Sequence, residues 1–194
     1  MKKFLIFAVV VIAAAGIYFG ITNKDKIAEI ADNLGASPEA SPADDGTSTE
    51  SDSIFAEPVT YSALKQEYTS ITQNFSFKYS DGFKVSSAPV AGGGEVTTVE
   101  NTKGSGFQVF SIAWDESDPI TPERIWQDMP DADVLEPKNA KLDGEEALVF
   151  YGYDEDMGET FEVWAVYKGK LYQISGPKMA EKLVTETLET WDWK

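Results

Sequence analysis

The side chains that most suggest chemistry form an acidic run at residues 154–159, Asp-Glu-Asp-Met-Gly-Glu, followed by Glu162. Calcium is a hard cation that takes several carboxylate oxygens from one tight turn. Asp154, Asp156, Glu159 and Glu162 are therefore the predicted metal ligands, and the sequence suggests no cofactor besides Ca²⁺. The run departs from an EF-hand loop, because a glycine occupies its fifth position, where that loop has a ligand. The alternative interpretation is a solvated hairpin tip in an acidic protein.

Missing residue types exclude much other chemistry. The 194 residues include no cysteine and no histidine, which excludes disulfides, thiolate nucleophiles, zinc–thiolate sites and a Ser/His/Asp triad. The chain carries 16 Lys and Arg against 33 Asp and Glu, a net charge of −17. Binding to nucleic acid relies on neutralising phosphates with basic side chains, so we predict no nucleic-acid partner.

No set of catalytic residues can be named from the sequence. Paired carboxylates are the basis of glycoside hydrolysis, but with 33 acidic residues no pair stands out. We therefore predict that the chain is not an enzyme, and an envelope hydrolase that uses buried carboxylates is the rival hypothesis. The five tryptophans suit a core better than a binding groove.

Period-two alternation and apolar runs between turn signals predict strands. The predicted strands are residues 75–79, 83–85, 95–100, 107–114, 145–153, 160–167 and 171–175. Short loops connect most of them, and short loops join antiparallel neighbours. Strands 107–114 and 160–167 are apolar on both faces, so their sheet must be covered on both sides.

Helical segments are predicted to supply that cover. Thr121 and Pro122 form the start of one helix, with a capping residue and a proline at the first position. A second helix begins after Pro177, and a short third helix is expected at residues 62–68. The predicted fold is α+β, a mostly antiparallel sheet covered by helices on both faces, that is, an α/β/α sandwich. An open β-sandwich with a second sheet is the alternative.

The amino-terminal part has the composition of a membrane anchor and a tether. Residues 4–21 are uncharged and mainly apolar, and as a helix they span roughly 27 Å against a hydrocarbon core of about 30 Å. We predict an anchor helix with a short extension at residues 1–34, a disordered acidic linker rich in Ser, Pro and Ala at 35–57, and a globular domain at 58–194. Lys2 and Lys3 place the amino terminus in the cytoplasm and the domain outside it. The alternative is a signal peptide cleaved near Ala15, which leaves a secreted or periplasmic protein.

Two segments carry a resemblance to a known superfamily. Residues 74–85 read Asn-Phe-Ser-Phe-Lys-Tyr-Ser-Asp-Gly-Phe-Lys-Val, and residues 188–193 read Leu-Glu-Thr-Trp-Asp-Trp. Together with the order of elements, they resemble the PsbP/Mog1-like superfamily, and in particular small anchored bacterial envelope proteins of unknown function. Ser80 stands where the superfamily commonly has proline. The resemblance implies an α/β/α sandwich and an accessory or binding role, and it brings no shared catalytic residues.

These observations give one leading hypothesis for function. We expect a single-pass cell-membrane protein whose extracytoplasmic domain binds a protein partner in the envelope and has no catalytic activity. Its membrane contact is the amino-terminal helix. The alternatives are a calcium- or ligand-dependent envelope module and a carboxylate-based envelope hydrolase.

Overall fold

The computed structural model of the chain describes residues 59–90, 93–114 and 119–194. Within these residues, no helix is both long enough and apolar enough to cross a membrane. The predicted anchor at residues 4–21 and the predicted linker at 35–57 lie outside the described residues.

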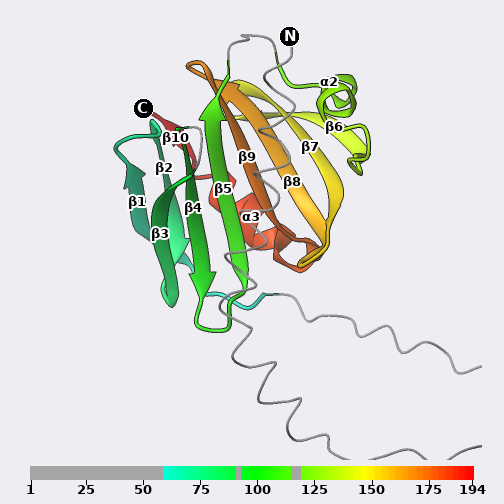
Figure 1. Cartoon of the computed structure of the whole chain (residues 1–194). Coiled ribbons are helices and arrows are strands. Elements are labelled where there is room, and N and C mark those ends of the chain that lie inside the picture. The colour runs from blue at the N-terminus through cyan, green and yellow to red at the C-terminus, as the bar shows by residue number, and fades with distance from the viewer. Residues whose placement is uncertain (1–58, 91–92, 115–118) are drawn as a thin grey trace, which may run out of the picture.

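Two antiparallel sheets make up most of the described domain (Figure 1). The smaller sheet has the order β1-β2-β10, formed by Leu64–Ser70, Phe75–Ser80 and Asp192–Trp193. The larger sheet has seven strands in the order β3-β4-β5-β9-β8-β7-β6. In that order, the strands are Phe83–Val90, Gly94–Asn101, Gly106–Ala113, Lys170–Pro177, Gly158–Tyr167, Glu145–Asp154 and Leu135–Leu142. All neighbouring strands run antiparallel.

The helical segments of the described residues are short. They are α2 (Pro122–Asp128), the 3₁₀ helix η1 (Lys178–Ala180) and α3 (Glu181–Leu188). The start of α2 is the predicted one, because Thr121 Oγ1 accepts a hydrogen bond from the Arg124 N–H at 3.2 Å and Pro122 occupies the first turn.

The main core lies between the two sheets and against α3. Phe75 and Phe77 of β2 are buried there, and Phe75 stacks on Trp191 with ring centroids 4.5 Å apart. The ring of Tyr172 of β9 lies at 84° to that of Phe75, with ring centroids 6.0 Å apart. Contacts between aromatic rings stabilise the fold beyond the free energy gained from burying the apolar surface of the rings. The stack therefore connects the two sheets and the segment after α3.

A second, smaller core covers the opposite face of the large sheet. Ile125 of α2 packs there with Leu148, Phe150 and Trp164 from β7 and β8. The Arg124 guanidinium also lies 4.8 Å from the centre of the Trp114 ring. Each central strand thus buries both of its faces, as its apolar pattern requires.

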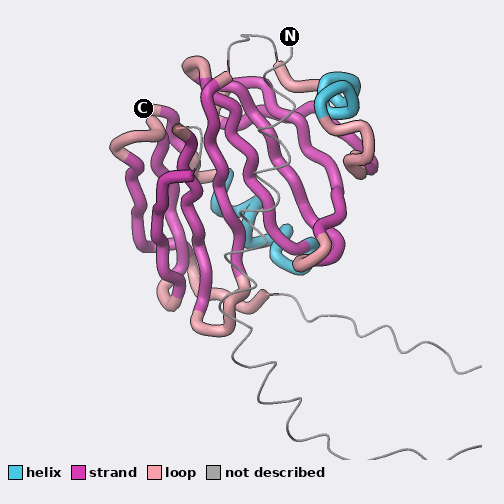
Figure 2. The backbone as a smooth tube through the Cα atoms, viewed as in Figure 1, coloured by secondary structure: helices cyan, strands magenta, loops and turns pink. Residues whose placement is uncertain are grey.

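The prediction of helices over both faces is wrong. On one face of the large sheet the cover is a second sheet with one eight-residue helix, and on the other it is α2, of seven residues (Figure 2). The difference arises at residues 62–68, which are predicted as a helix. Most of them belong to strand β1 instead. Paired with β2, that strand makes a sheet where a helical layer was expected. The domain is therefore mostly antiparallel β structure in two sheets, with the second sheet that the alternative prediction named.

Strand assignments from the sequence differ from the structure in two further places. The short turn at 80–82 predicts a hairpin of the segments at 75–79 and 83–85. They form strands but do not pair, because β2 pairs with β1 and β10 while β3 pairs with β4. Strand β6 was not predicted. It joins β7 through Asp143 and Gly144, both at positive φ (45° and 87°), the geometry of a two-residue hairpin turn.

Replacing Phe75 with alanine tests the aromatic connection between the sheets. Because its ring is fully buried between Trp191 and Tyr172, we expect Phe75→Ala to lower the free energy of unfolding by about 3–5 kcal/mol. Denaturant unfolding followed by circular dichroism measures the change. Tyr153→Ala, at an exposed aromatic, is the matched control and should change stability by less than about 1 kcal/mol. Equal losses in the two variants would contradict a central role for the stack.

Candidate functional site

The four predicted calcium ligands lie around the β7–β8 hairpin but have different surroundings. Asp154 Oδ1 accepts hydrogen bonds from the backbone N–H groups of Asp156 and Met157, both at 2.9 Å. Glu159 forms an ion pair with Lys178 at 2.9 Å. Asp156 is exposed, whereas Glu162 is buried within strand β8. The side chain of Asp154 thus stabilises the backbone of the hairpin turn.

These positions do not bring a ligand set together. Among the described residues, no group of three or more acidic side chains is placed to hold a metal ion. Binding of Ca²⁺ by this loop stays a prediction of the sequence, and the structure adds no observation in its favour.

Glu162 is the described side chain with the most unusual electrostatic environment. It lies on the α2 side of β8, opposite Phe150 of β7 and Ser175 of β9, and is only 9% exposed. The Ser175 hydroxyl donates a hydrogen bond to Glu162 Oε1 at 2.6 Å. The Trp164 indole N–H donates to the other carboxyl oxygen at 3.1 Å. Both oxygens are therefore held by neighbours on the same face of the sheet.

Burial raises the pKa of Glu162 from 4.5 to about 7. Hydrogen bonds from Ser175, Thr160 and Trp164 oppose this rise, and the negative charge of Asp154 adds to it. The carboxyl group can thus take up or release a proton near neutral pH. It is enclosed by its neighbours, so it does not offer its oxygens to a molecule in solution.

Gly152 makes the space in which Glu162 lies. A β-carbon at Gly152 would come within 2.9 Å of Thr160 Oγ1 and 3.6 Å of Glu162 Cγ. The sequence predicts Glu162 as a calcium ligand and gives no site role to Thr160, Trp164 or Ser175. One available signal was a single glutamate within a strand that is otherwise apolar on both faces.

Two large apolar side chains are exposed side by side at the other face of the same strands. Leu135 of β6 is 55% exposed and Tyr153 of β7 is 63% exposed. Leu135 pairs directly with Tyr151, and Tyr153 follows two residues later, so the three side chains share one face. We call Leu135, Tyr151 and Tyr153 the corner patch. Its strands, β6 and β7, are the last two of the large sheet, at the opposite end from β3 (Figure 1).

Charged side chains from η1 and α3 adjoin this patch. The Tyr151 hydroxyl donates to Glu181 Oε1 at 3.1 Å, and the Lys178 ammonium lies 4.9 Å from the centre of the Tyr151 ring. Burial, followed by the hydrogen bond to Glu181, raises the pKa of Tyr151. The corner patch is therefore continuous with the first turns of the helical segment.

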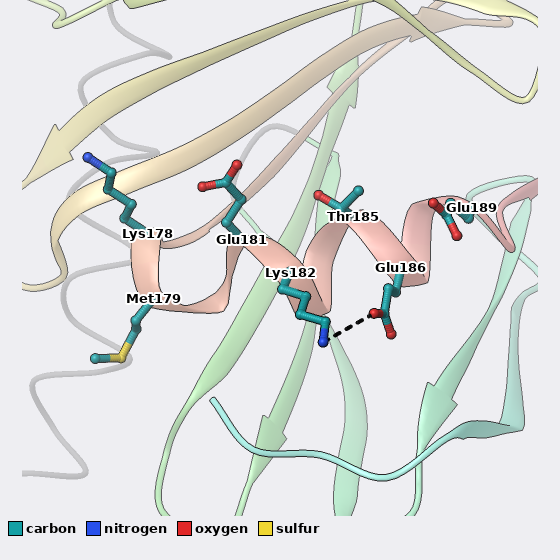
Figure 3. Close-up of a pocket in the computed structure, with 7 residues that line it drawn as sticks. All are labelled: Lys178, Met179, Glu181, Lys182, Thr185, Glu186 and Glu189. Carbon is teal, nitrogen blue, oxygen red and sulfur yellow. Dashed lines mark ion pairs between the residues drawn. The ribbon is translucent and has the colours of Figure 1, made fainter. Parts of the chain in front are cut away.

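An open groove runs along this helical segment (Figure 3). Its described lining consists of Lys178, Met179, Glu181, Lys182, Thr185, Glu186 and Glu189. Lys182 and Glu186 form an ion pair at 3.8 Å, on a different side of the helix from Lys178 and Glu181. The groove is open and five of its seven described lining residues are charged, so it suits a segment of chain lying along it better than an enclosed small molecule.

Comparison with solved structures gives a likeness of fold. No protein-family model and no curated protein sequence matches the chain. A solved structure that it resembles is the solution structure of cyanobacterial PsbP (CyanoP) from Synechocystis sp. PCC 6803, with 12% sequence identity and a TM-score of 0.46. The match covers 66% of this chain and 92% of that chain. It agrees with the PsbP/Mog1-like resemblance of the sequence, and we transfer no ligand, partner or residue role from it.

Replacing Glu162 with glutamine isolates its contribution to stability. The pKa of Glu162 is higher in the folded state (about 7) than the ordinary value of 4.5, so the folded protein binds this proton more tightly. Stability from this group is complete below about pH 4.5 and is lost as the pH rises through 7. The loss is on the order of 3 kcal/mol. Glu162→Gln carries no charge, and its amide can donate to the Ser175 hydroxyl while its oxygen accepts from Trp164.

The measurement is the free energy of unfolding at pH 5 and pH 8 in both proteins. We expect the wild type to lose more stability than Glu162→Gln over this range, so that the variant is the more stable of the two at pH 8. Ser175→Ala is a companion variant, because losing its hydrogen bond should raise the pKa of Glu162 further and move the transition to higher pH. Parallel pH profiles for wild type and Glu162→Gln would contradict the assignment.

Proposed function

We propose that the chain is a membrane-anchored, extracytoplasmic binding protein without catalytic activity, and that a protein partner docks on the corner patch. The observation that carries the proposal is the adjacency of Leu135 and Tyr153, each more than half exposed on one face of two paired strands. Isolated exposed apolar residues are ordinary, but neighbouring ones mark interaction sites. Tyrosine is also among the residues that contribute most to the free energy of binding at interfaces.

The non-catalytic part of the proposal is supported by the surroundings of Glu162. A general acid or base must reach the reacting group directly or through one water. The oxygens of Glu162 are instead engaged with Ser175 and Trp164 inside the sheet. The enclosure of this carboxyl group, whose pKa is near neutrality, supports a role in the fold and not in catalysis.

The anchored and extracytoplasmic parts rest on the sequence. The apolar run at residues 4–21 follows two lysines, and the run at 35–57 has the composition of a flexible tether. The first described residue, Val59, lies next to the groove, because its N–H donates to the Met179 carbonyl at 3.4 Å. The tether would thus enter the domain near the proposed docking surface.

Crosslinking in native membranes tests this function. The intact protein is crosslinked, purified and analysed by mass spectrometry, together with the double variant Leu135→Ser/Tyr153→Ser. Loss of two interface anchors should reduce capture of a specific partner by about tenfold or more. Ile71→Ser is the matched control, because Ile71 is 94% exposed in the turn between β1 and β2 and lies outside the patch. A partner captured equally by wild type and double variant would overturn the proposal, as would the absence of any partner.

A further inference from the structure

The corner patch has an acidic border. Glu159 pairs directly with Tyr153 across the β7–β8 hairpin, and the turn beyond carries two exposed carboxylates, Glu155 and Asp156. Glu136 follows Leu135 and acts electrostatically on both Tyr151 and Lys178. The bordering acidic residues are Glu136, Glu155, Asp156, Glu159 and Glu181.

The basic side chains at this border are already engaged with acidic ones. Lys178 pairs with Glu159 at 2.9 Å, and Lys138 pairs with Glu136 at 3.8 Å. In the adjoining groove, Lys182 likewise pairs with Glu186. The excess charge around the exposed apolar side chains is therefore negative, so a positively charged partner is favoured.

The same charge argues against two other occupants of the patch. The chain's own segment 36–57 contains no Lys or Arg and several acidic residues, so it would be repelled from this border. A second copy of the chain carries the same net charge of −17. Like-charge contacts oppose binding, so neither occupant complements this border.

We infer that the corner patch and the adjoining groove bind a Lys/Arg-rich segment of a protein partner that carries an apolar anchor residue. The inference rests on the proposed function and adds the chemical class of the partner. The anchor residue packs against Leu135 and Tyr153, and the basic side chains lie against the carboxylates of the β7–β8 turn and of Glu181. A guanidinium group can also stack on the exposed ring of Tyr153.

Selection from a displayed library of random dodecapeptides tests the partner class. The full-length protein in detergent is the bait, and peptides that also bind Leu135→Ser/Tyr153→Ser are removed. We expect the remaining peptides to be enriched in Lys and Arg next to a large apolar residue. Selected peptides that are neutral or acidic, or no peptide specific to the patch, would overturn the inference.

Charge variants separate the acidic border from the apolar anchor. The best selected peptide is synthesised and its affinity measured by fluorescence anisotropy. Glu155→Gln/Asp156→Asn changes two exposed carboxylates that do not close the turn, and it should weaken binding severalfold and reduce its dependence on salt. Asp81→Asn, at an exposed carboxylate in the β2–β3 turn, is the matched control and should leave affinity unchanged. Equal affinity in all three proteins would contradict a role for the border.

Two outcomes distinguish this inference from the proposed function. If the native partner is lost with the double variant but no basic peptide is selected, the inference fails and the proposed function stands. If sedimentation shows that the wild type forms a dimer that Leu135→Ser/Tyr153→Ser abolishes, the occupant is a second copy and the inference is wrong.

Discussion

The stacking of Phe75 on Trp191 is the contact on which the architecture depends. It joins β2 of the small sheet to the segment that leaves α3, and the edge contact of Tyr172 extends it to the large sheet. The adjoining strand β10 then pairs with β2 through Asp192 and Trp193. Trp193 in turn stacks on Tyr167 at 4.5 Å and donates its indole N–H to the Leu142 carbonyl. One aromatic cluster thus fixes the small sheet against the large one and fills the main core.

The sequence predicted individual strands and helix starts better than it predicted how sheets and helices are layered. Alternation in residues such as Phe75 to Tyr79 identified strands, and Thr121 with Pro122 located the start of α2. The apolar spacing of residues 62–68 fits a helix, but over so short a segment it does not exclude a strand. Pairing with β2 makes most of these residues a strand. The strand before Asp143 was missed because its residues are almost all exposed and lack an apolar pattern. The Asp143-Gly144 pair, a strong hairpin signal, would have identified it.

The candidate sites differ in how far the sequence reveals them. Acidic composition drew attention to residues 154–162, but composition does not tell whether a carboxylate caps a turn, pairs with a lysine or lies buried. The structure assigns these three roles to Asp154, Glu159 and Glu162 respectively. The exposure of Leu135 and Tyr153 depends on where the small sheet and α3 stop covering the large one, and that boundary is a tertiary property. Alternation along one strand carries no information about it.

The pairing of β10 with β2 has a consequence for biogenesis. Ser76 meets Asp192 across more than a hundred residues of chain, so the small sheet cannot be completed until nearly all of the described domain has left the ribosome. Contacts of such sequence separation slow folding, because loop closure precedes any stabilising gain. Until Trp191 has been synthesised, Phe75 and Phe77 lack one of their stacking partners. A nascent chain that lacks this partner exposes apolar surface, and such surface favours aggregation and creates the need for a chaperone.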